Sequence, residues 1–232
     1  MGRLNGGLLL TGKITTILVY IVSMEKPVEF GDIAELETQR SNVAAFYDHA
    51  APEYVEALES KTEYQLPRII REVYNKYGIK DGSVLDIGCG IGKIKDYLGP
   101  VFTYQGIDLS PGMVNEAKKN GFDAQLGPVE ELIKSFGDKS VDHITAMTML
   151  YFVKDWEGLA REFERVARKS IFVSLDQFES KLIQMMKTKG IDLYNHDASA
   201  IHDPTEVQKN VFIWKRAGTE DRVYGDIVFK KF

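Results

Sequence analysis

The sequence predicts a doubly wound α/β fold: a mostly parallel, seven-stranded sheet with helices on both faces, an antiparallel C-terminal hairpin and an N-terminal helical cap. Between residues 83 and 176, short β-rich runs alternate with segments of helical periodicity, the pattern of parallel strands joined by crossover helices. In SVLDIGCGIGK, residues 83–93, glycine occupies every second position where the first strand ends. The last two β-rich segments flank the short link AGTED, which indicates a hairpin.

The composition is that of an ordinary globular domain, with 44% hydrophobic and 27% charged residues in a chain of 232. A formal net charge of −5 argues against binding that depends on neutralising phosphates, so we expect no nucleic-acid partner. The chain has one cysteine, Cys89, and therefore no intrachain disulfide. This fits a reducing compartment, and we expect a cytoplasmic protein.

The first 40 residues are interpreted as an N-terminal extension. The apolar stretch Gly7–Ser23 is interrupted by Lys13 and is too short to span a bilayer, so we expect no stable membrane insertion. Met24 opens an ordinary soluble sequence, which favours a start-site artefact before it, while a peripheral strand or a membrane-touching tail stays open. The remaining residues, 41–232, are expected to form one domain with its helical cap at 41–62.

The helices are predicted from apolar spacing. The segment Ser41–Lys61 has helical spacing with a break near Pro52. A second amphipathic helix carries apolar residues at three- and four-residue steps from Leu66 and ends at Gly78. Ser110 followed by Pro111 is typical of a helix start, because the hydroxyl caps free backbone N–H groups and proline has a preset φ.

The strands are predicted from β-rich runs bounded by turn residues. They are expected at residues 83–88, 104–110, 122–127, 141–150, 170–176, 210–216 and 222–232. The run at 170–176 is apolar almost throughout, as expected for a strand covered on both faces.

The glycine-rich turn predicts a ligand site at the carboxyl end of the sheet. Gly88, Gly90 and Gly92 allow unusual φ angles and close approach of a ligand to the backbone. Asp108 lies 20 positions beyond Gly88 at the end of the second strand, where a carboxylate accepts hydrogen bonds from both ribose hydroxyls. The combination indicates an adenosine-bearing cofactor, either a dinucleotide or S-adenosylmethionine.

The glycine spacing favours S-adenosylmethionine. Dinucleotide sites carry G-x-G-x-x-G around a pyrophosphate, whereas this chain reads G-x-G-x-G. Asp86, two residues before the first glycine, is poorly placed beside a pyrophosphate but suits a cationic amino-acid group or a sulfonium. A Walker loop is excluded, because the chain has no G-x-x-x-x-G-K-[ST] at this turn.

The segments VLDIGCGIGKIKDYL and YQGIDLSPGMVNEAKK resemble the first two motifs of the class I S-adenosylmethionine-dependent methyltransferases, which have a Rossmann-like fold. The resemblance covers about Tyr47 to Asp176 and is closest to the small-molecule branch that includes the ubiquinone and menaquinone methyltransferases. It implies S-adenosyl-L-methionine as cofactor and a small-molecule methyl acceptor.

The resemblance also implies a set of cofactor-binding residues. Asp86, Gly88, Cys89 and Gly90 would face the methionyl end, although the Cys89 side chain is expected mainly to fill space under the loop. Asp108 would bind the ribose, and Val129 would offer a backbone N–H to adenine. The remaining members of this set are Tyr47, which would cover the cofactor, Leu109, which would pack on adenine, Met113, Glu130, and Met147 in the methyl-transfer channel.

Three departures from the family pattern indicate a diverged acceptor site. Pro128 replaces the usual aspartate for the adenine amino group, so either Glu130 or a backbone carbonyl would serve instead, or adenine recognition is looser. Phe152 stands where the branch often has a histidine, and the usual kpGG before the fifth strand is missing.

The sequence does not identify a catalytic base. Tyr151 and His49 are weak candidates at the acceptor site, each with a packing role as the plain alternative, and His143 is interpreted as structural or surface. The loop NHDASAIHDP matches no zinc spacing, so no metal is expected. Three residues after the fifth strand are equally compatible with an apolar acceptor pocket and with core packing: Phe178, Met185 and Met186.

Three hypotheses follow from these observations. The leading one is a methyltransferase acting on a small molecule, with the acceptor atom (O, N or C) and the oligomeric state open. The second is an S-adenosylmethionine-binding regulatory or partner protein without transferase activity. The third, a nicotinamide-dependent oxidoreductase, is disfavoured by the glycine spacing.

Overall fold

The computed structural model describes residues 36–48, 51, 62–216 and 222–232. Most of the predicted N-terminal extension, with Met24, lies outside the described residues, as do His49, most of the segment after Pro52, and the link AGTED.

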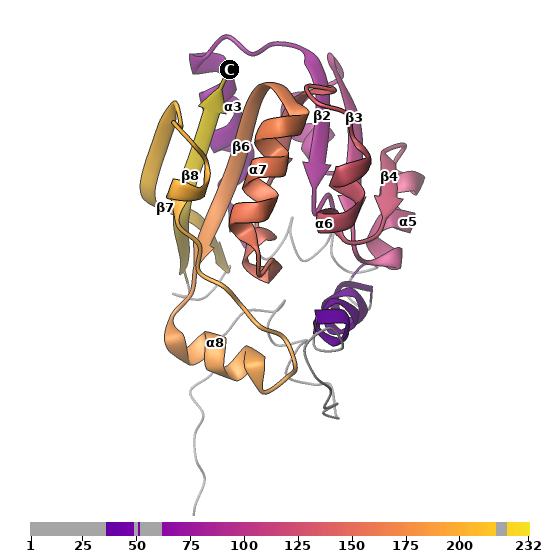
Figure 1. The fold of residues 1–232 in the computed structure, drawn as a ribbon, viewed down its shortest axis with the longest axis vertical. Helices are drawn as coiled ribbons and strands as arrows, with labels where there is room; N and C mark the ends of the chain where they lie inside the picture. The colour runs from indigo at the N-terminus through magenta and orange to yellow at the C-terminus, as the bar shows by residue number, and fades with distance from the viewer. Residues whose placement is uncertain (1–35, 49–50, 52–61, 217–221) are drawn as a thin grey trace, which may run out of the picture.

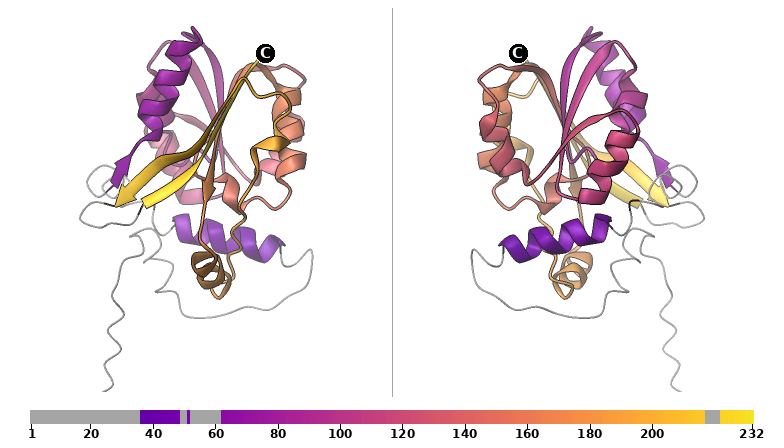
Figure 2. Two further views of the ribbon diagram at one scale, coloured as in Figure 1. Left: turned by 90° about the vertical axis from the view of Figure 1, so that its left-hand side faces the viewer. Right: turned by 90° about the vertical axis from the view of Figure 1, so that its right-hand side faces the viewer.

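The fold is a single mixed sheet with helices on both faces (Figures 1 and 2). Its order is β1-β7-β8-β6-β5-β2-β3-β4, in which the five consecutive strands from β6 to the edge strand β4 are parallel and the C-terminal pair is antiparallel. The parallel strands are β2 (Gly82–Ile87), β3 (Phe102–Asp108), β4 (Asp123–Leu126), β5 (Val141–Ala146) and β6 (Ala167–Gln177). The predicted fold class is confirmed.

The C-terminal strands form the predicted antiparallel pair, β7 (Glu206–Arg216) and β8 (Arg222–Lys231), with β8 beside β6. The sheet is extended beyond the seven predicted strands by β1 (Thr62–Tyr64), which pairs with β7. Three residues give too weak a β pattern for sequence analysis to separate this strand from the helix that follows it.

Two apolar layers hold the helices on the sheet. One packs residues of α7 (Trp156–Val166) and α6 (Val129–Leu132) against alternate residues of the central strands, among them Leu85 and Ile144. The other layer packs α3 (Leu66–Lys76), α4 (Ile94–Leu98) and α5 (Pro111–Lys119) on the opposite face, against Val84 and Phe172. The alternation follows from the two-residue period of a strand.

A further helix, residues 36–48, and α8 (Ser180–Lys187) lie across the carboxyl ends of the parallel strands (Figure 2). We call residues 36–48 the cap helix. Its C-terminal end is docked by Asp48, which accepts a hydrogen bond from the backbone N–H of Gly112 in the first turn of α5. The predicted start of α5 is also present, since the Ser110 hydroxyl accepts from the N–H of Met113 at 3.1 Å.

Some predicted boundaries are wrong. The cap helix is already helical at residue 36, not from Ser41, and β5 ends at Ala146, four residues before the predicted end. Thr148 adopts a φ of 53° and its N–H donates to the Ser174 hydroxyl at 2.8 Å, so the chain turns away from the sheet there. The next residues form a 3₁₀ turn, η2 (Leu150–Phe152).

Candidate functional site

The glycine loop after β2 uses its glycines in two ways. Gly88 has a φ of +66°, and a Cβ at this position would lie 2.5 Å from the Cγ of Met149. Gly90 has a φ of +52°, but a Cβ there would meet no atom within 4 Å. Gly88 is therefore required by packing inside the protein, whereas Gly90 faces open space.

Asp108, at the end of β3, ties the loop to the start of α5. One carboxylate oxygen accepts from the N–H of Gly90 at 2.8 Å, and the other accepts from the N–H of Ser110 at 2.9 Å. Burial raises the pKa of Asp108, and these backbone hydrogen bonds act against that rise by favouring the ionised form. The carboxylate is fixed in position while keeping free lone pairs for further donors.

Asp86, near the end of β2, is buried with only 4% of its surface exposed. Its Oδ1 accepts from the hydroxyl of Thr145 on β5 at 2.6 Å. Burial raises the pKa of Asp86 to about 7, and the negative charge of Asp108 adds to the rise. A cation beside Asp86 would favour its ionised form, so this carboxyl group is suited to a positively charged ligand.

Two adjoining hollows lie on either side of the glycine loop. The larger encloses about 840 Å³, including space open to solvent, beside Asp108, and the smaller encloses about 430 Å³ beside Asp86. Both are lined by Gly88, Gly90, Met147 and Thr148, which makes them two parts of one cleft. Together they are lined by all eleven predicted cofactor-binding residues: Tyr47, Asp86, Gly88, Cys89, Gly90, Asp108, Leu109, Met113, Val129, Glu130 and Met147.

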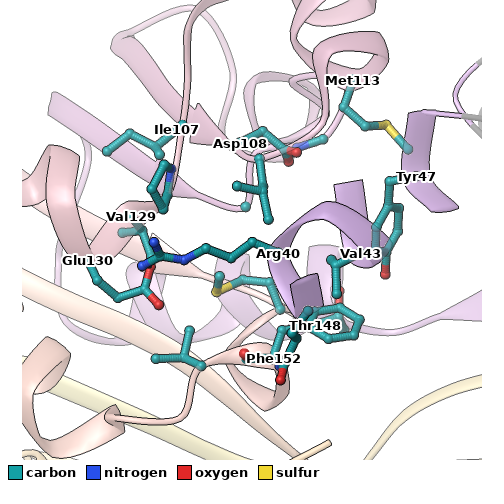
Figure 3. Close-up of a pocket in the computed structure, with 18 of the residues that line it drawn as sticks. Arg40, Val43, Tyr47, Ile107, Asp108, Met113, Val129, Glu130, Thr148 and Phe152 are labelled. Atoms are coloured by element: carbon teal, nitrogen blue, oxygen red, sulfur yellow. Dashed lines mark hydrogen bonds and ion pairs between the residues drawn. The ribbon is translucent and has the colours of Figure 1, made fainter. Parts of the chain in front are cut away.

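The cap helix supplies cleft residues that the sequence analysis missed. Arg40 reaches across toward Val129 and Glu130 (Figure 3), where its Nη2 lies 3.5 Å from a Glu130 oxygen and its Nη1 lies 2.7 Å from Glu131. The other missed cap residues in the lining are Leu36, Gln39 and Val43. Positions 36, 40, 43 and 47 are three or four residues apart and therefore lie on one face of a helix. The same spacing in the sequence would indicate this face for a predicted helix that begins before Ser41.

Adenine recognition by Glu130 would have to share that carboxylate with Arg40. Pro128, the departure from the family pattern, precedes the first residue of α6 and also lines the cleft. Val129 is the first residue of α6, and the N–H groups in the first turn of a helix have no partner within it.

Tyr151 lies beside the cleft but is not one of its lining residues. Its ring is 4.4 Å from that of Phe152 and 4.9 Å from that of Phe178, between centroids, and its hydroxyl hydrogen bonds with Tyr47. Burial raises the pKa of Tyr47 to about 12, so the Tyr47 hydroxyl is not a base near neutral pH. We call Tyr47, Tyr151, Phe152 and Phe178 the aromatic cluster.

Cys89 and His143 have structural environments. The sulfur of Cys89 fills the space above Gly106 on β3, since a Cβ at Gly106 would lie 2.5 Å from it, and burial raises the thiol pKa. His143 is fully buried in β5 between the Ser170 hydroxyl at 2.8 Å and the Asp81 carbonyl at 3.0 Å, and burial lowers its pKa.

Side chains of the loop NHDASAIHDP, residues 195–204, make local contacts. Nε2 of His196 lies 3.0 Å from the Leu150 carbonyl, and Asp197 accepts from the N–H of Ser199. In the described part of the chain, no group of three or more His, Cys, Asp or Glu side chains is arranged to hold a metal ion.

The residues after β6 join the apolar cluster under the cap. Met186 is buried, and Phe178 and Met185 are partly buried against Val43 and Phe46 of the cap helix.

None of the helices that the structure describes is long and apolar enough to cross a membrane.

Comparison with known proteins agrees with this geometry. A family model described as a methyltransferase domain matches residues 85–173, from β2 to β6, including the glycine loop and Asp108. No curated protein matches the sequence directly. This central part of the chain is therefore similar to methyltransferase domains.

Several solved structures share the fold at low sequence identity. A chain from the complex of the Haloferax volcanii Trm112 methyltransferase activator with a methyltransferase is 18% identical, with a TM-score of 0.56 over 74% of this chain and 79% of that one. A SAM-dependent methyltransferase from Thermotoga maritima is 18% identical, with a TM-score of 0.52 over 80% and 98%. The N-terminal domain of EvdMO1, solved with S-adenosylhomocysteine bound, is 16% identical, with a TM-score of 0.51 over 71% and 80%. The fold is therefore that of class I methyltransferases.

Proposed function

We propose that the protein is an S-adenosylmethionine-dependent methyltransferase that acts on a small molecule, in the branch that includes the ubiquinone and menaquinone methyltransferases. The observation that carries the proposal is the open space at Gly90, in a loop flanked in sequence by the buried Asp86 and hydrogen-bonded to the partly buried Asp108. Asp108 lines the larger hollow and Asp86 lines the smaller, so a ligand that spans both would meet one carboxyl group in each.

Asp108 would bind the ribose. Each of its oxygens already accepts one backbone N–H, and an ionised carboxylate has about four acceptor sites, so two ribose hydroxyls can still donate to it. Leu109 and Met113 would pack near adenine, and the Val129 N–H would donate to a ring nitrogen. Glu130 or a backbone carbonyl near Pro128 would accept from the adenine amino group.

Asp86 would hold the methionyl ammonium group, with Gly88, Cys89 and Gly90 following the amino-acid end of the cofactor. A pyrophosphate beside Asp86 would face a second negative charge, which disfavours a dinucleotide in this loop. Thr145 fixes the rotamer of Asp86 through the 2.6 Å hydrogen bond, so the carboxyl group is positioned before the ligand arrives.

S-adenosylmethionine bound in this cleft supplies an electrophilic methyl group on a sulfonium, which an acceptor takes by in-line displacement. The residues at the junction of the hollows, Met147 and Thr148, would define the channel, and Tyr47 would cover it. Their contribution is to exclude water and align donor and acceptor, since positioning accounts for much of the barrier in such a reaction.

Calorimetry with S-adenosylmethionine, S-adenosylhomocysteine and NADH tests the cofactor, with Asp108→Asn as the site variant. We expect micromolar binding of both adenosyl ligands, a loss of at least tenfold in Asp108→Asn, and no binding of NADH. NADH binding that depends on Asp108 would replace the proposal with the oxidoreductase hypothesis.

Incubation with methyl-labelled S-adenosylmethionine and a cell extract then tests transfer. Label in the small-molecule fraction supports the proposed acceptor class, and label in protein or nucleic acid contradicts it. Cofactor binding without any labelled product would favour the regulatory protein.

A further inference from the structure

Asp176 is a buried acid that the proposed function does not use. It lies at the carboxyl end of β6 with 2% of its surface exposed. Neither carboxylate oxygen has a hydrogen-bond partner among the described residues. The Ser174 hydroxyl, two residues back on the same face of the strand, favours the ionised form but lies outside hydrogen-bond geometry. A carboxyl group in this situation costs folding free energy, which suggests that a ligand satisfies it.

The position of Asp176 in the sheet places it on the same face and at the same edge as Asp86. Every second residue of β6 faces the same side, and Phe172, four residues back, packs against Tyr74 of α3 on that side. Asp86 shares this face on β2, because Val84, two residues before it, lies in the same apolar layer. Asp176 and Asp86 are thus on one face of the sheet, at the edge where the cleft opens.

Tyr47 connects Asp176 to the cofactor part of the cleft. This residue of the cap helix lines the larger hollow (Figure 3). The negative charges of Asp108 and of Asp176 both act on its hydroxyl, so both carboxyl groups lie at short range from it. Tyr47 is therefore a cap-helix residue near both Asp176 and Asp108, the predicted ribose ligand.

The aromatic cluster provides the apolar surroundings for such a ligand. Phe178 follows Asp176 by two residues, and its ring stacks edge-on with that of Tyr151 at 4.9 Å. Phe152 lies 4.4 Å from Tyr151 and 6.0 Å from Tyr47, measured between ring centroids. Aromatic faces attract organic cations, and a buried carboxylate without a protein cation is a complementary partner for an ammonium group.

We propose that Asp176 and the aromatic cluster bind the ammonium group of the methyl acceptor, so that the acceptor is a small amine with an apolar body. The inference rests on the proposed function, which leaves the acceptor's chemical class open. Asp176 acts here as a specificity-determining residue: it selects a cationic acceptor over a neutral one of the same shape. A neutral acceptor would leave the carboxylate buried and unpaired.

The test is calorimetric titration of the full chain, saturated with S-adenosylhomocysteine, with butylamine, phenethylamine and tetramethylammonium. The matched neutral probes are 1-butanol and 2-phenylethanol. We expect at least one cation to bind, its Kd to weaken at least tenfold in Asp176→Asn, and the neutral probes to bind both proteins equally. The control is Asp203→Asn, an exposed carboxylate distant in sequence, which should leave every Kd unchanged.

A second variant, Phe178→Leu, separates the rings from the charge. It keeps an apolar side chain, and we expect the cation to bind several-fold more weakly while the neutral probes are unaffected. The proposal is overturned if no cation binds the wild-type protein, or if cations bind Asp176→Asn as tightly as the wild type. It is also overturned if the alcohols match the amines.

Separate titrations distinguish failure of the proposed function from failure of the role of Asp176. The titrations are repeated without nucleoside, and S-adenosylmethionine binding is measured without any amine. If the wild type binds no nucleoside, the methyltransferase assignment is contradicted. If it binds the nucleoside but does not prefer cations to neutral probes, only the role of Asp176 is contradicted.

Discussion

Gly88 and Gly90 are the same residue type at neighbouring positions, but their surroundings assign them different tasks. Gly88 is closed in by the Met149 side chain, and Gly90 opens into the cleft while its N–H is held by Asp108. Substitution should therefore separate folding from binding within one loop.

We expect Gly90→Ala to fold and to lose cofactor affinity. Its positive φ costs an alanine about 1–2 kcal/mol, and the added methyl group would occupy space that the cofactor needs. The expected result in calorimetry is a Kd for S-adenosylmethionine at least tenfold weaker, with a fall in Tm of a few degrees. Gly88→Ala should show a larger fall in Tm, because strain and a clash with Met149 add together. Equal affinity of Gly90→Ala and the wild type would remove the loop from the site.

Asp86 should make cofactor binding depend on pH. Its pKa is raised to about 7 mainly by burial, so at pH 6 the free protein holds a proton there. An ammonium group bound beside it favours the ionised form and expels that proton. We expect affinity to rise from pH 6 to 7, with proton release visible as a buffer-dependent calorimetric enthalpy. Asp86→Asn should bind more weakly with no such dependence, and the same pH slope in both proteins would contradict the role.

Among the secondary-structure elements, the strands and the glycine loop were predictable and the cap was predicted only in part. Most of the parallel strands are short apolar runs ended by Asp, Gly or Ser, so the local pattern locates them, whereas β5 has no such residue at its end and its predicted end was wrong. Arg40 was missed because its role depends on where the cap helix packs: the sequence gives a helical face but not the partner of that face. Asp176 was also missed, because a lone acid at a strand end looks the same in sequence whether or not it has a partner.

The cap helix is held over the cleft by Arg40, and we expect this contact to contribute to cofactor affinity. Arg40→Ala removes the bonds to Glu130 and Glu131 on α6, so the cap should dock less firmly over the bound ligand. The expected effect is a three- to tenfold weaker Kd, expressed mainly as faster dissociation in stopped-flow measurements. Arg68→Ala, which breaks an exposed pair with Glu72 far from the cap, is the matched control. Equal dissociation rates for both variants would argue against a closing role of the cap.

Across the whole molecule, buried acids at the two ends of the sheet differ in whether nearby cations offset the effect of burial on their pKa values. Asp142, at the other end of the sheet, is desolvated too, but the Ser83 N–H, Arg168 and Lys169 outweigh burial and lower its pKa to about 2. Asp86 and Asp176, at the carboxyl end, have no cation among the described residues, and burial raises the pKa of each to about 7. At neutral pH, Asp86 and Asp176 thus lower the stability of the folded protein, whereas Asp142 contributes to it.

This difference predicts how stability varies with pH. An acid with a pKa near 7 in the folded state and about 3.9 in the unfolded state binds more protons when folded, so its contribution to stability falls as pH rises from about 4 to 7. Each such group lowers the unfolding free energy by up to roughly 1.4 kcal/mol per pH unit in this window. Two histidines with lowered pKa values, the buried His143 and the half-buried His196, act in the opposite direction, so the wild-type slope alone is not diagnostic.

The effect of the two acids is isolated by comparing the wild type with the double variant Asp86→Asn/Asp176→Asn. The free energy of unfolding of each protein is measured in urea, without ligand, from pH 5 to 7.5. We expect the variant to gain stability relative to the wild type as pH rises, by several kcal/mol at pH 7.5. Asp142→Asn should be less stable by a similar amount at every pH in this window, since Asp142 stays ionised in both states above pH 5. A constant difference between the double variant and the wild type would mean that the acids at the binding end are not desolvated. The cation-binding roles of Asp86 and Asp176 would then lose their physical basis, because only a carboxyl group that is costly when unpaired gains strongly from a bound cation.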